Sequence, residues 1–344
     1  MEVMTPLATG GLLFIIFFIL LLIGAPIMVG LGMATMACFL LLGIDLSIMV
    51  ERAFASLTAF PLMALPAFVL AGALMEASGI SRRLVNIAEN IVGPIPGGLA
   101  ISTVLSCVFF GAISGSGPAT TAAVGMLMIP AMTKRGYDTA YAAAATSTAG
   151  GIGIIIPPSI PMVIYGVTGQ VSISKMFMAG FIPGIIVAIS LCVVHYLRCK
   201  NISTAGMTWN AKNLLFSLKD GFWSILAPLI ILGGIYAGWF TPTEAAVVAI
   251  FYTLLVGLFI HRELKLRSIM ASLKTTSWLS GRVLVLVFTA TSFGYLMTSY
   301  RIPNDIATMV LSLTDNVYIV WVFVVVLLVF LGMFMETLAI IMLV

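Results

Sequence analysis

Two short segments of the sequence combine glycine, serine and proline within otherwise apolar stretches. The first is Ser114-Gly115-Ser116-Gly117-Pro118-Ala119-Thr120-Thr121, and the second runs from Gly150-Gly151-Ile152-Gly153 to Pro157-Pro158-Ser159-Ile160-Pro161. Such segments interrupt a helix, because proline donates no backbone N–H and glycine lets the backbone turn. Carbonyl and hydroxyl oxygens freed at a helix end suit a hard monovalent cation, whereas the N–H groups at a helix start suit an anion. The pair predicts a sodium site beside an anion site; the alternative is that these small residues only permit tight helix packing.

The composition indicates that both segments lie in a membrane protein. The chain has 344 residues, of which 61% are hydrophobic and 8% are charged, and its mean hydropathy is +1.20. Soluble domains carry about 25% charged residues, so the charges here are too few to cover a soluble fold of this size. Disordered, collagen-like, coiled-coil and nucleic-acid-binding proteins are excluded on the same grounds. We therefore expect an all-α polytopic membrane protein with discontinuous helices, in contact with the lipid bilayer.

The positions of the basic residues predict the orientation of the chain in the membrane. Residues 198–220 and 261–274 are rich in Lys and Arg, and basic loops lie on the cytoplasmic side. Arg82-Arg83 and Lys134-Arg135 flank the apolar run 95–131, so both ends of this run are expected inside. The break at its centre then predicts a re-entrant hairpin of two half-helices, with Ser114–Pro118 at the tip. Two short full spans are the alternative.

Two parts of the chain resemble each other weakly. Residues 72–80 are similar to residues 294–302, and residues 110–114 are similar to residues 331–336. The charge pattern predicts that the first copy runs from outside to inside before its hairpin and that the second runs the other way. This is an inverted repeat, which is typical of secondary transporters.

The breaks and charges divide the chain into four predicted parts. We expect an N-terminal transmembrane scaffold segment at 1–52, in which residues 11–42 form one kinked span or two short ones. The first inverted repeat is expected at 53–197, with the hairpin 95–131 and a broken helix at 138–168. A cytoplasmic linker, two scaffold spans and a basic loop follow at 198–275, and a second, incomplete repeat at 276–344. Residues 79–94 and 301–316 are predicted to be connecting loops.

The run Gly111–Pro130 followed by Gly150–Pro161 resembles the large membrane subunit of TRAP transporters (tripartite ATP-independent periplasmic transporters), which belong to the ion transporter superfamily. Gly24-Ala25-Pro26-Ile27 and Pro242-Thr243-Glu244-Ala245-Ala246 also resemble that family. The resemblance implies an elevator-type, sodium-coupled permease of the bacterial inner membrane, and not an enzyme. It implies three partners: a small four-helix membrane subunit, a periplasmic substrate-binding protein, and an organic anion such as sialic acid, a C4-dicarboxylate or another sugar acid. The family continues past Val344, so we expect the second hairpin to be incomplete here.

The same resemblance implies roles for individual residues. It implies that the sodium ion is held by Ser114, Gly115, Ser116, Gly151 and Gly153. It implies that the substrate lies near Thr120, Pro158 and Ser159. Glu336 stands where the second hairpin tip of the family has an acidic residue, and is implied to hold sodium as well. A carboxylate in apolar surroundings indicates function by default; the alternative is an interfacial residue.

Other classes of function are weighed on the same residues. The sequence argues against an ATP-driven pump, because it has no GxxxxGK and no soluble motor domain. A serine protease at Ser114 or Ser116 needs a base, and the two histidines, His195 and His261, lie at basic helix ends. An ion or anion channel remains the main alternative, together with a sodium/organic-anion symporter that needs no binding protein. A test of sodium dependence distinguishes coupled transport from a channel.

Overall fold

The computed structural model describes residues 6–200, 209–314, 316–333 and 335–343. Every regular element in these ranges is a helix, so the described part of the chain is all-α, as the composition predicts. The chain forms two compact units. Unit 1 comprises residues 1–59 and 281–344, and unit 2 comprises residues 60–280.

Unit 1 contains the two ends of the chain. Its helices are α1 (Pro6–Leu22), α2 (Ile27–Leu42), α3 (Leu46–Leu57), the C-terminal part of α14 (Leu266–Ser299), α15 (Ile302–Leu313), α16 (Val317–Gly332) and α17 (Thr337–Leu343). The ring of Phe293 on α14 packs against Phe17 on α1, with 5.9 Å between ring centroids. The guanidinium of Arg52 lies 5.0 Å from the ring centroid of Tyr295, a favourable cation–π distance. Residues 11–42 are thus two helices, separated at Gly24-Ala25-Pro26.

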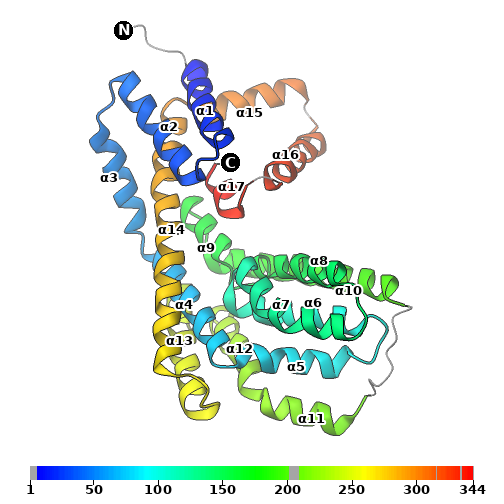
Figure 1. The fold of residues 1–344 in the computed structure, drawn as a ribbon. Coiled ribbons are helices and arrows are strands. Elements are labelled where there is room, and N and C mark those ends of the chain that lie inside the picture. Colours follow the sequence, from blue (N-terminus) through cyan, green and yellow to red (C-terminus); the bar gives the residue numbers. More distant parts are fainter. Residues whose placement is uncertain (1–5, 201–208, 315, 334, 344) are drawn as a thin grey trace. The chain divides into compact units, whose positions relative to one another are not determined.

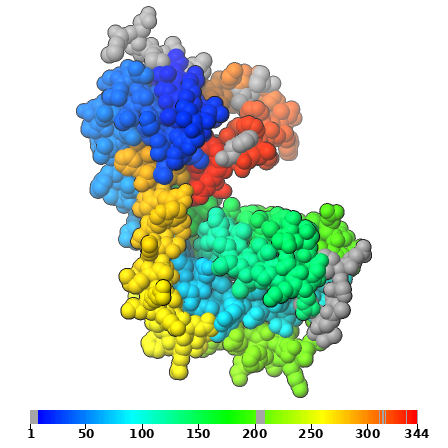
Figure 2. All heavy atoms as spheres, in the orientation of Figure 1, coloured from blue at the N-terminus to red at the C-terminus, as the bar shows by residue number. Residues whose placement is uncertain are grey.

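Unit 2 contains both breaks that were predicted from the sequence. Its helices are η1 (Phe60–Met63), α4 (Ala64–Ala77), α5 (Ile80–Val92), α6 (Gly98–Ser114), α7 (Gly117–Lys134), α8 (Thr139–Gly150), η2 (Gly151–Ile154), α9 (Ile160–Thr168), α10 (Ile173–Arg198), α11 (Ala211–Asp220), α12 (Phe222–Tyr236), α13 (Pro242–Leu255), η3 (Val256–Ile260) and the start of α14. The buried helix α6 packs against α5, α7, α8 and α10, and α11 lies beyond α5 (Figure 1). In the space-filling view, residues of α7 and α8, coloured turquoise to green, form one continuous face of this unit (Figure 2).

Four described helices are long and apolar enough to cross a membrane. They are Phe60–Ala77, Ile173–Arg198, Pro242–Ile260 and Leu266–Ser299. A fifth span results if α11 and α12, which are bent by 56° at Gly221, count as one. These helices correspond to predicted apolar runs, which supports a multi-pass membrane protein.

The prediction of loops at 79–94 and 301–316 was wrong, because both segments contain helices. In α5, Ile80, Leu84 and Ile87 are buried, and they recur at the helical period. Arg82 is exposed, and Glu89 is half-buried. The charges that suggested a chain break therefore lie along an amphipathic helix. The second segment forms α15, and the predicted basic loop at 261–274 likewise ends where α14 begins at Leu266.

Ion pairs connect the start of α5 to distant parts of unit 2. The Arg83 guanidinium lies 2.9 Å from the Glu263 carboxylate and 3.2 Å from that of Asp220. Arg82 also pairs with Glu263, at 2.8 Å. Burial and the nearby Arg83 guanidinium lower the pKa of His261, although its contact with the Ser78 carbonyl opposes this shift. These contacts hold the α4–α5 turn against the segment that leads into α14.

Candidate functional site

Two serines begin the helices that follow the two breaks. Ser116 is the N-cap of α7 and Ser159 is the N-cap of α9, with backbone angles of −130°, 123° and −132°, 127°. A proline follows two residues later in each case, at Pro118 and Pro161. The sequences Ser-Gly-Pro and Ser-Ile-Pro favour this geometry, because serine caps the free N–H groups and proline is tolerated in the first turn. Unit 2 therefore has two helix starts of the same local form.

The tip between α6 and α7 contains a small cluster of hydroxyl groups. The hydroxyls of Ser114 and Thr120 lie 2.9 Å apart. Thr120 also donates a hydrogen bond to the Ser116 carbonyl at 2.7 Å. Ser114 and Thr120 are buried, whereas Ser116 is half-buried. Gly115 between the two helices has a φ of +62°, which a glycine adopts readily.

The second break holds its shape through Ser159. Residues Gly151–Ile154 form a 3₁₀ turn after α8, and α9 begins only at Ile160. The Ser159 hydroxyl donates a hydrogen bond of 2.6 Å to the Ile154 carbonyl. It also accepts from the Met162 N–H, at 3.4 Å. The hydroxyl of Ser159 therefore closes the loop that separates the two helices.

The two breaks contact each other directly. The Ile160 N–H donates to the Gly115 carbonyl at 3.1 Å. A Cβ atom on Gly115 would lie 2.7 Å from the Pro158 carbonyl oxygen, and one on Gly111 would lie 2.7 Å from the Gly153 Cα. Glycines at 111 and 115 therefore let the backbones of the two breaks approach each other closely.

The structure brings most of the predicted site residues together in unit 2. Gly153 lies against the Thr120 side chain, and a Cβ at this position would be 3.2 Å from the Ser116 carbonyl oxygen. Seven of the predicted site residues lie where the two breaks meet: Ser114, Gly115, Ser116, Thr120, Gly153, Pro158 and Ser159. Thr120, which we predicted beside the substrate, is hydrogen-bonded to two of the predicted sodium ligands.

The remaining predicted sodium ligands are Gly151 and Glu336. Gly151 opens the 3₁₀ turn, and no other atom lies within 4 Å of the position of a Cβ on this residue. Glu336 belongs to unit 1, is exposed, and precedes α17. Its carbonyl accepts hydrogen bonds from Ala339 and Ile340. The role of Glu336 as a sodium ligand stays a prediction.

Neutral oxygen atoms dominate the junction of the two breaks. In the described part of the chain, no three His, Cys, Asp or Glu side chains are grouped so that they could hold a metal ion. Hydroxyl and carbonyl oxygens without a carboxylate suit a monovalent cation better than a transition metal, which prefers imidazole or thiolate ligands. The positive dipole ends at the starts of α7 and α9 suit an anion, but the Ile160 and Met162 N–H groups of α9 are already bonded to Gly115 and Ser159.

Sequence reasoning missed the part that α4 plays at this junction. A Cβ on Gly72 would lie 3.1 Å from the Ser114 Cα, so the backbone of α4 passes directly beside the tip. One helical turn later comes Glu76, the one charged residue of the span Phe60–Ala77. A single carboxylate in an apolar helix was the signal that could have directed attention to this helix.

The comparisons with known proteins agree with the resemblance found in the sequence. The family model of the tripartite ATP-independent periplasmic transporter DctM component matches residues 14–344. The isethionate TRAP transporter permease protein DctMQ of Oleidesulfovibrio alaskensis is 43% identical over 330 residues, which are 95% of this chain and 52% of that protein. The C4-dicarboxylate TRAP transporter large permease protein DctM of Pseudomonas aeruginosa is 40% identical over 282 residues, 81% of this chain and 66% of that protein.

A third relative has a different named substrate. The sialic acid TRAP transporter large permease protein SiaM of Vibrio cholerae is 38% identical over 283 residues, 82% of this chain and 66% of that protein. The chain thus spans between 52% and 66% of the length of these curated relatives. All three are permease proteins, which confirms the prediction that the chain is not an enzyme.

Proposed function

Because the chain belongs to the DctM component family of tripartite ATP-independent periplasmic transporters, we propose that it is the large membrane permease of such a transporter. Its proposed activity is the sodium-coupled uptake of an organic anion across the bacterial inner membrane. A periplasmic substrate-binding protein delivers the anion, and a small four-helix membrane subunit completes the transporter. The predicted inverted repeat supports an elevator-type mechanism, in which the part that carries the substrate moves against a scaffold.

The observation that carries the proposal is the junction of the two helix breaks. The Ile160 N–H donates to the Gly115 carbonyl at 3.1 Å, so the start of α9 is bonded to the tip between α6 and α7. The oxygens of the tip and the first turns of two helices therefore meet in one place. A cation bound to the oxygens would fix the backbone of the junction, and an anion bound to the helix starts would fix the same backbone. This shared backbone gives a physical basis for coupling the binding of the cation to the binding of the anion.

We propose a binding order that the geometry of the junction supports. Sodium at Ser114 and Ser116 fixes the tip and, through Gly115 and Ile160, the start of α9. The positive dipole ends of the two helices are then positioned for the charged group of the substrate. In this scheme sodium binds before the anion and is transported together with it.

The helix starts and the names of the relatives support a proposal for the substrate class. The three relatives are named for isethionate, C4-dicarboxylates and sialic acid. Each of these compounds carries a sulfonate or a carboxylate. Helix starts bind such groups through backbone N–H groups, without requiring a particular side chain. We infer that the substrate of this chain is a small organic acid with a carboxylate or sulfonate group.

The test is transport by the full chain, reconstituted in vesicles with its small subunit and binding protein. Uptake of labelled sialic acid, C4-dicarboxylate and isethionate is measured with and without an inward sodium gradient, in the absence of ATP. We expect uptake of one of these acids to require both sodium and the binding protein. Uptake at an unchanged rate without sodium would refute the coupling. Passive equilibration without a gradient would indicate a channel, and sodium-driven uptake without the binding protein would indicate a stand-alone symporter.

A further inference from the structure

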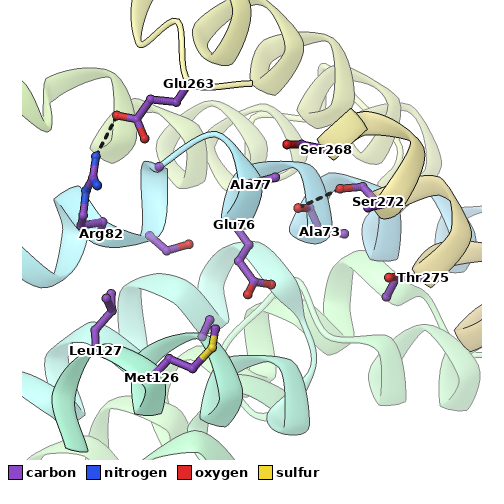
Figure 3. Close-up of a pocket in the computed structure, with 14 residues that line it drawn as sticks. Ala73, Glu76, Ala77, Arg82, Met126, Leu127, Glu263, Ser268, Ser272 and Thr275 are labelled. Atoms are coloured by element: carbon purple, nitrogen blue, oxygen red, sulfur yellow. Dashed lines mark hydrogen bonds and ion pairs between the residues drawn. The ribbon is translucent and has the colours of Figure 1, made fainter. Parts of the chain in front are cut away.

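A cavity of about 530 Å³ lies in unit 2 between α4, α7 and the start of α14. Its walls come from the end of α4, the start of α5, the middle of α7 and the start of α14, together with Glu263. Figure 3 shows the Glu76 side chain extending from α4 into the space between Met126 and Leu127 on one side and Ser272 and Thr275 on the other. The cavity is therefore built around a carboxylate.

The Glu76 carboxylate is the one charged group of the cavity lining that has no oppositely charged partner in the described residues. The other two charged residues that line it, Arg82 and Glu263, form an ion pair at 2.8 Å. No side-chain hydrogen bond or ion pair of the described residues involves the carboxylate of Glu76. The lining thus has a formal charge of −1, which attracts cations and repels organic anions.

A buried hydroxyl that also lines the cavity lacks a partner. Ser81 is 6% exposed, and its hydroxyl makes no hydrogen bond. A buried polar group usually has a partner, because leaving it unbonded is unfavourable. The Ser81 oxygen is itself enclosed, so it adds a polar group to the wall without being open to the cavity. Ser268 and Thr275 add two more hydroxyl groups to the same walls.

Both walls of the cavity lead to the predicted sodium ligands at the tip. On α4, Glu76 follows Gly72 by one turn on the same face, and Gly72 lies against Ser114. On α7, Ala123 and Leu127 line the cavity, and Thr120 precedes them on the same face. The hydroxyls of Ser114 and Thr120 are 2.9 Å apart. One helical turn, about 5.4 Å along the axis, thus separates the carboxylate level from the tip cluster on α4.

We propose that this cavity is the passage by which sodium moves between the hairpin tip and the cytoplasmic side, with Glu76 as the carboxylate that attracts the cation into it. The proposal rests on the proposed sodium coupling. The basic residues of 79–94 and 261–274 place the outer end of the cavity, at Arg82 and Ser268, on the cytoplasmic side. The organic anion must leave by another route, because the same charge repels it.

The first test measures transport by Glu76→Gln in the full reconstituted transporter. We expect the maximal uptake rate to fall about tenfold, as for the loss of a carboxylate acting over a few ångströms in a partly hydrated cavity. The external sodium concentration for half-maximal uptake stays unchanged, because the tip ligands are intact. Glu76→Asp keeps the charge and retains most of the rate. Glu89→Gln is the matched control, since it neutralises a carboxylate on α5 that does not line the cavity.

The second test does not depend on sodium coupling. Ser268→Cys places a thiol in the cavity wall, and it is labelled from the cytoplasmic side with thiol reagents of equal size and opposite charge. Labelling of the unsubstituted chain gives the background from its four native cysteines. We expect the cationic reagent to react faster than the anionic one, and this preference to disappear when Glu76→Gln is added.

The two tests separate failure of the passage from failure of the proposed function. If the unsubstituted transporter requires sodium but Glu76→Gln transports at the same rate, the passage is wrong and the coupling stands. An absence of charge preference at Ser268→Cys also overturns the passage. If the unsubstituted transporter does not require sodium, the proposed function fails, and the passage fails with it as a route for sodium.

Discussion

The helix starts at Ser116 and Ser159 have the same backbone geometry but different surroundings. Their φ and ψ angles agree within 2° and 4°. The Ser159 hydroxyl is buried and donates to the Ile154 carbonyl at 2.6 Å. The Ser116 hydroxyl belongs to a half-buried residue and accepts from the Ala119 N–H at 3.4 Å, the same distance as in the bond from the Met162 N–H to Ser159. Of the two hydroxyls, only that of Ser159 donates a hydrogen bond within the described residues, so the Ser116 hydroxyl keeps its proton and a lone pair for a ligand.

The residue after each serine shows the same contrast. At Gly117, a Cβ would lie 3.3 Å from the Ile154 side chain and 3.4 Å from the Gly150 carbonyl oxygen. At the other start, Ile160 is buried and its N–H bonds to Gly115. The start of α7 must stay small to approach the second break, and the start of α9 is anchored by a large apolar residue. In the proposed function, α9 is then the fixed partner of the junction and the tip is the part expected to respond to sodium.

The largest effect is expected where the two breaks are closest. In Gly111→Ala, the new Cβ would lie 2.7 Å from the Gly153 Cα, so one of two backbones must move. Overpacking costs about 1–3 kcal/mol, and the displaced backbone carries the bond between Gly115 and Ile160. We expect uptake to fall at least about tenfold and thermal stability in detergent to decrease.

Gly233→Ala is the control for this change. Gly233 lies within α12, and no other atom lies within 4 Å of its Cβ position. Alanine is favoured over glycine by about 1 kcal/mol inside a helix, so stability should be kept or increased. If Gly111→Ala transports like Gly233→Ala, the close approach of the two breaks is not needed for transport.

Ser159→Ala is expected to have the next largest effect, on stability. It leaves the Ile154 carbonyl without its donor, which costs about 1–3 kcal/mol for a buried acceptor. The start of α9 becomes less well fixed, so the substrate concentration for half-maximal uptake should rise. The external sodium concentration for half-maximal uptake should not change. A shift in sodium dependence of the same size as the shift for substrate would show that the two helix starts do not differ in role.

Ser116→Ala is expected to show the opposite pattern. The long bond to Ala119 contributes little to stability, so expression and melting temperature should stay close to those of the unsubstituted chain. Loss of a ligand hydroxyl costs about 1 kcal/mol, and the sodium concentration for half-maximal uptake should rise roughly fivefold. Thr120→Ser, which keeps the bond to the Ser116 carbonyl, should transport normally, whereas Thr120→Val should follow Ser116→Ala. Unchanged sodium dependence in Ser116→Ala and Thr120→Val would make the tip a packing element.

The sequence predicts the places where the helices break, because the signals are local. Proline removes a donor, and glycine permits a positive φ such as the +62° of Gly115. The contacts between the breaks could not be predicted in this way. The approach of Gly111 to Gly153 and the bond from Ile160 to Gly115 join residues more than 40 positions apart, and no local pattern specifies such a pairing.

The same locality explains the wrong predictions. Arg82, Arg83 and Glu89 were interpreted as a break between spans, although Ile80, Leu84 and Ile87 follow the period of an amphipathic helix. Charge alone does not end a helix when the charged side chains reach partners, and Arg83 reaches Asp220 and Glu263. The basic residues Arg267 and Lys274 likewise lie within the 34 residues of α14. Partners distant in the sequence decide these cases.

The smallest effect is expected at Gly151, and it tests how far the junction extends into the second break. Gly151 has φ −59° and ψ −24°, which any residue adopts, and no other atom lies within 4 Å of its Cβ position. Gly151→Ala should therefore be neutral or stabilising by a few tenths of a kcal/mol, since alanine restricts the unfolded chain. A backbone carbonyl ligand survives this change, so the sodium dependence should be unchanged even if Gly151 binds the ion. Gly153→Ala, two residues later, would push against Thr120 and the Ser116 carbonyl, and should raise the sodium requirement. Equal behaviour of the two variants in a sodium titration of uptake would mean that the second break does not shape the site at the tip.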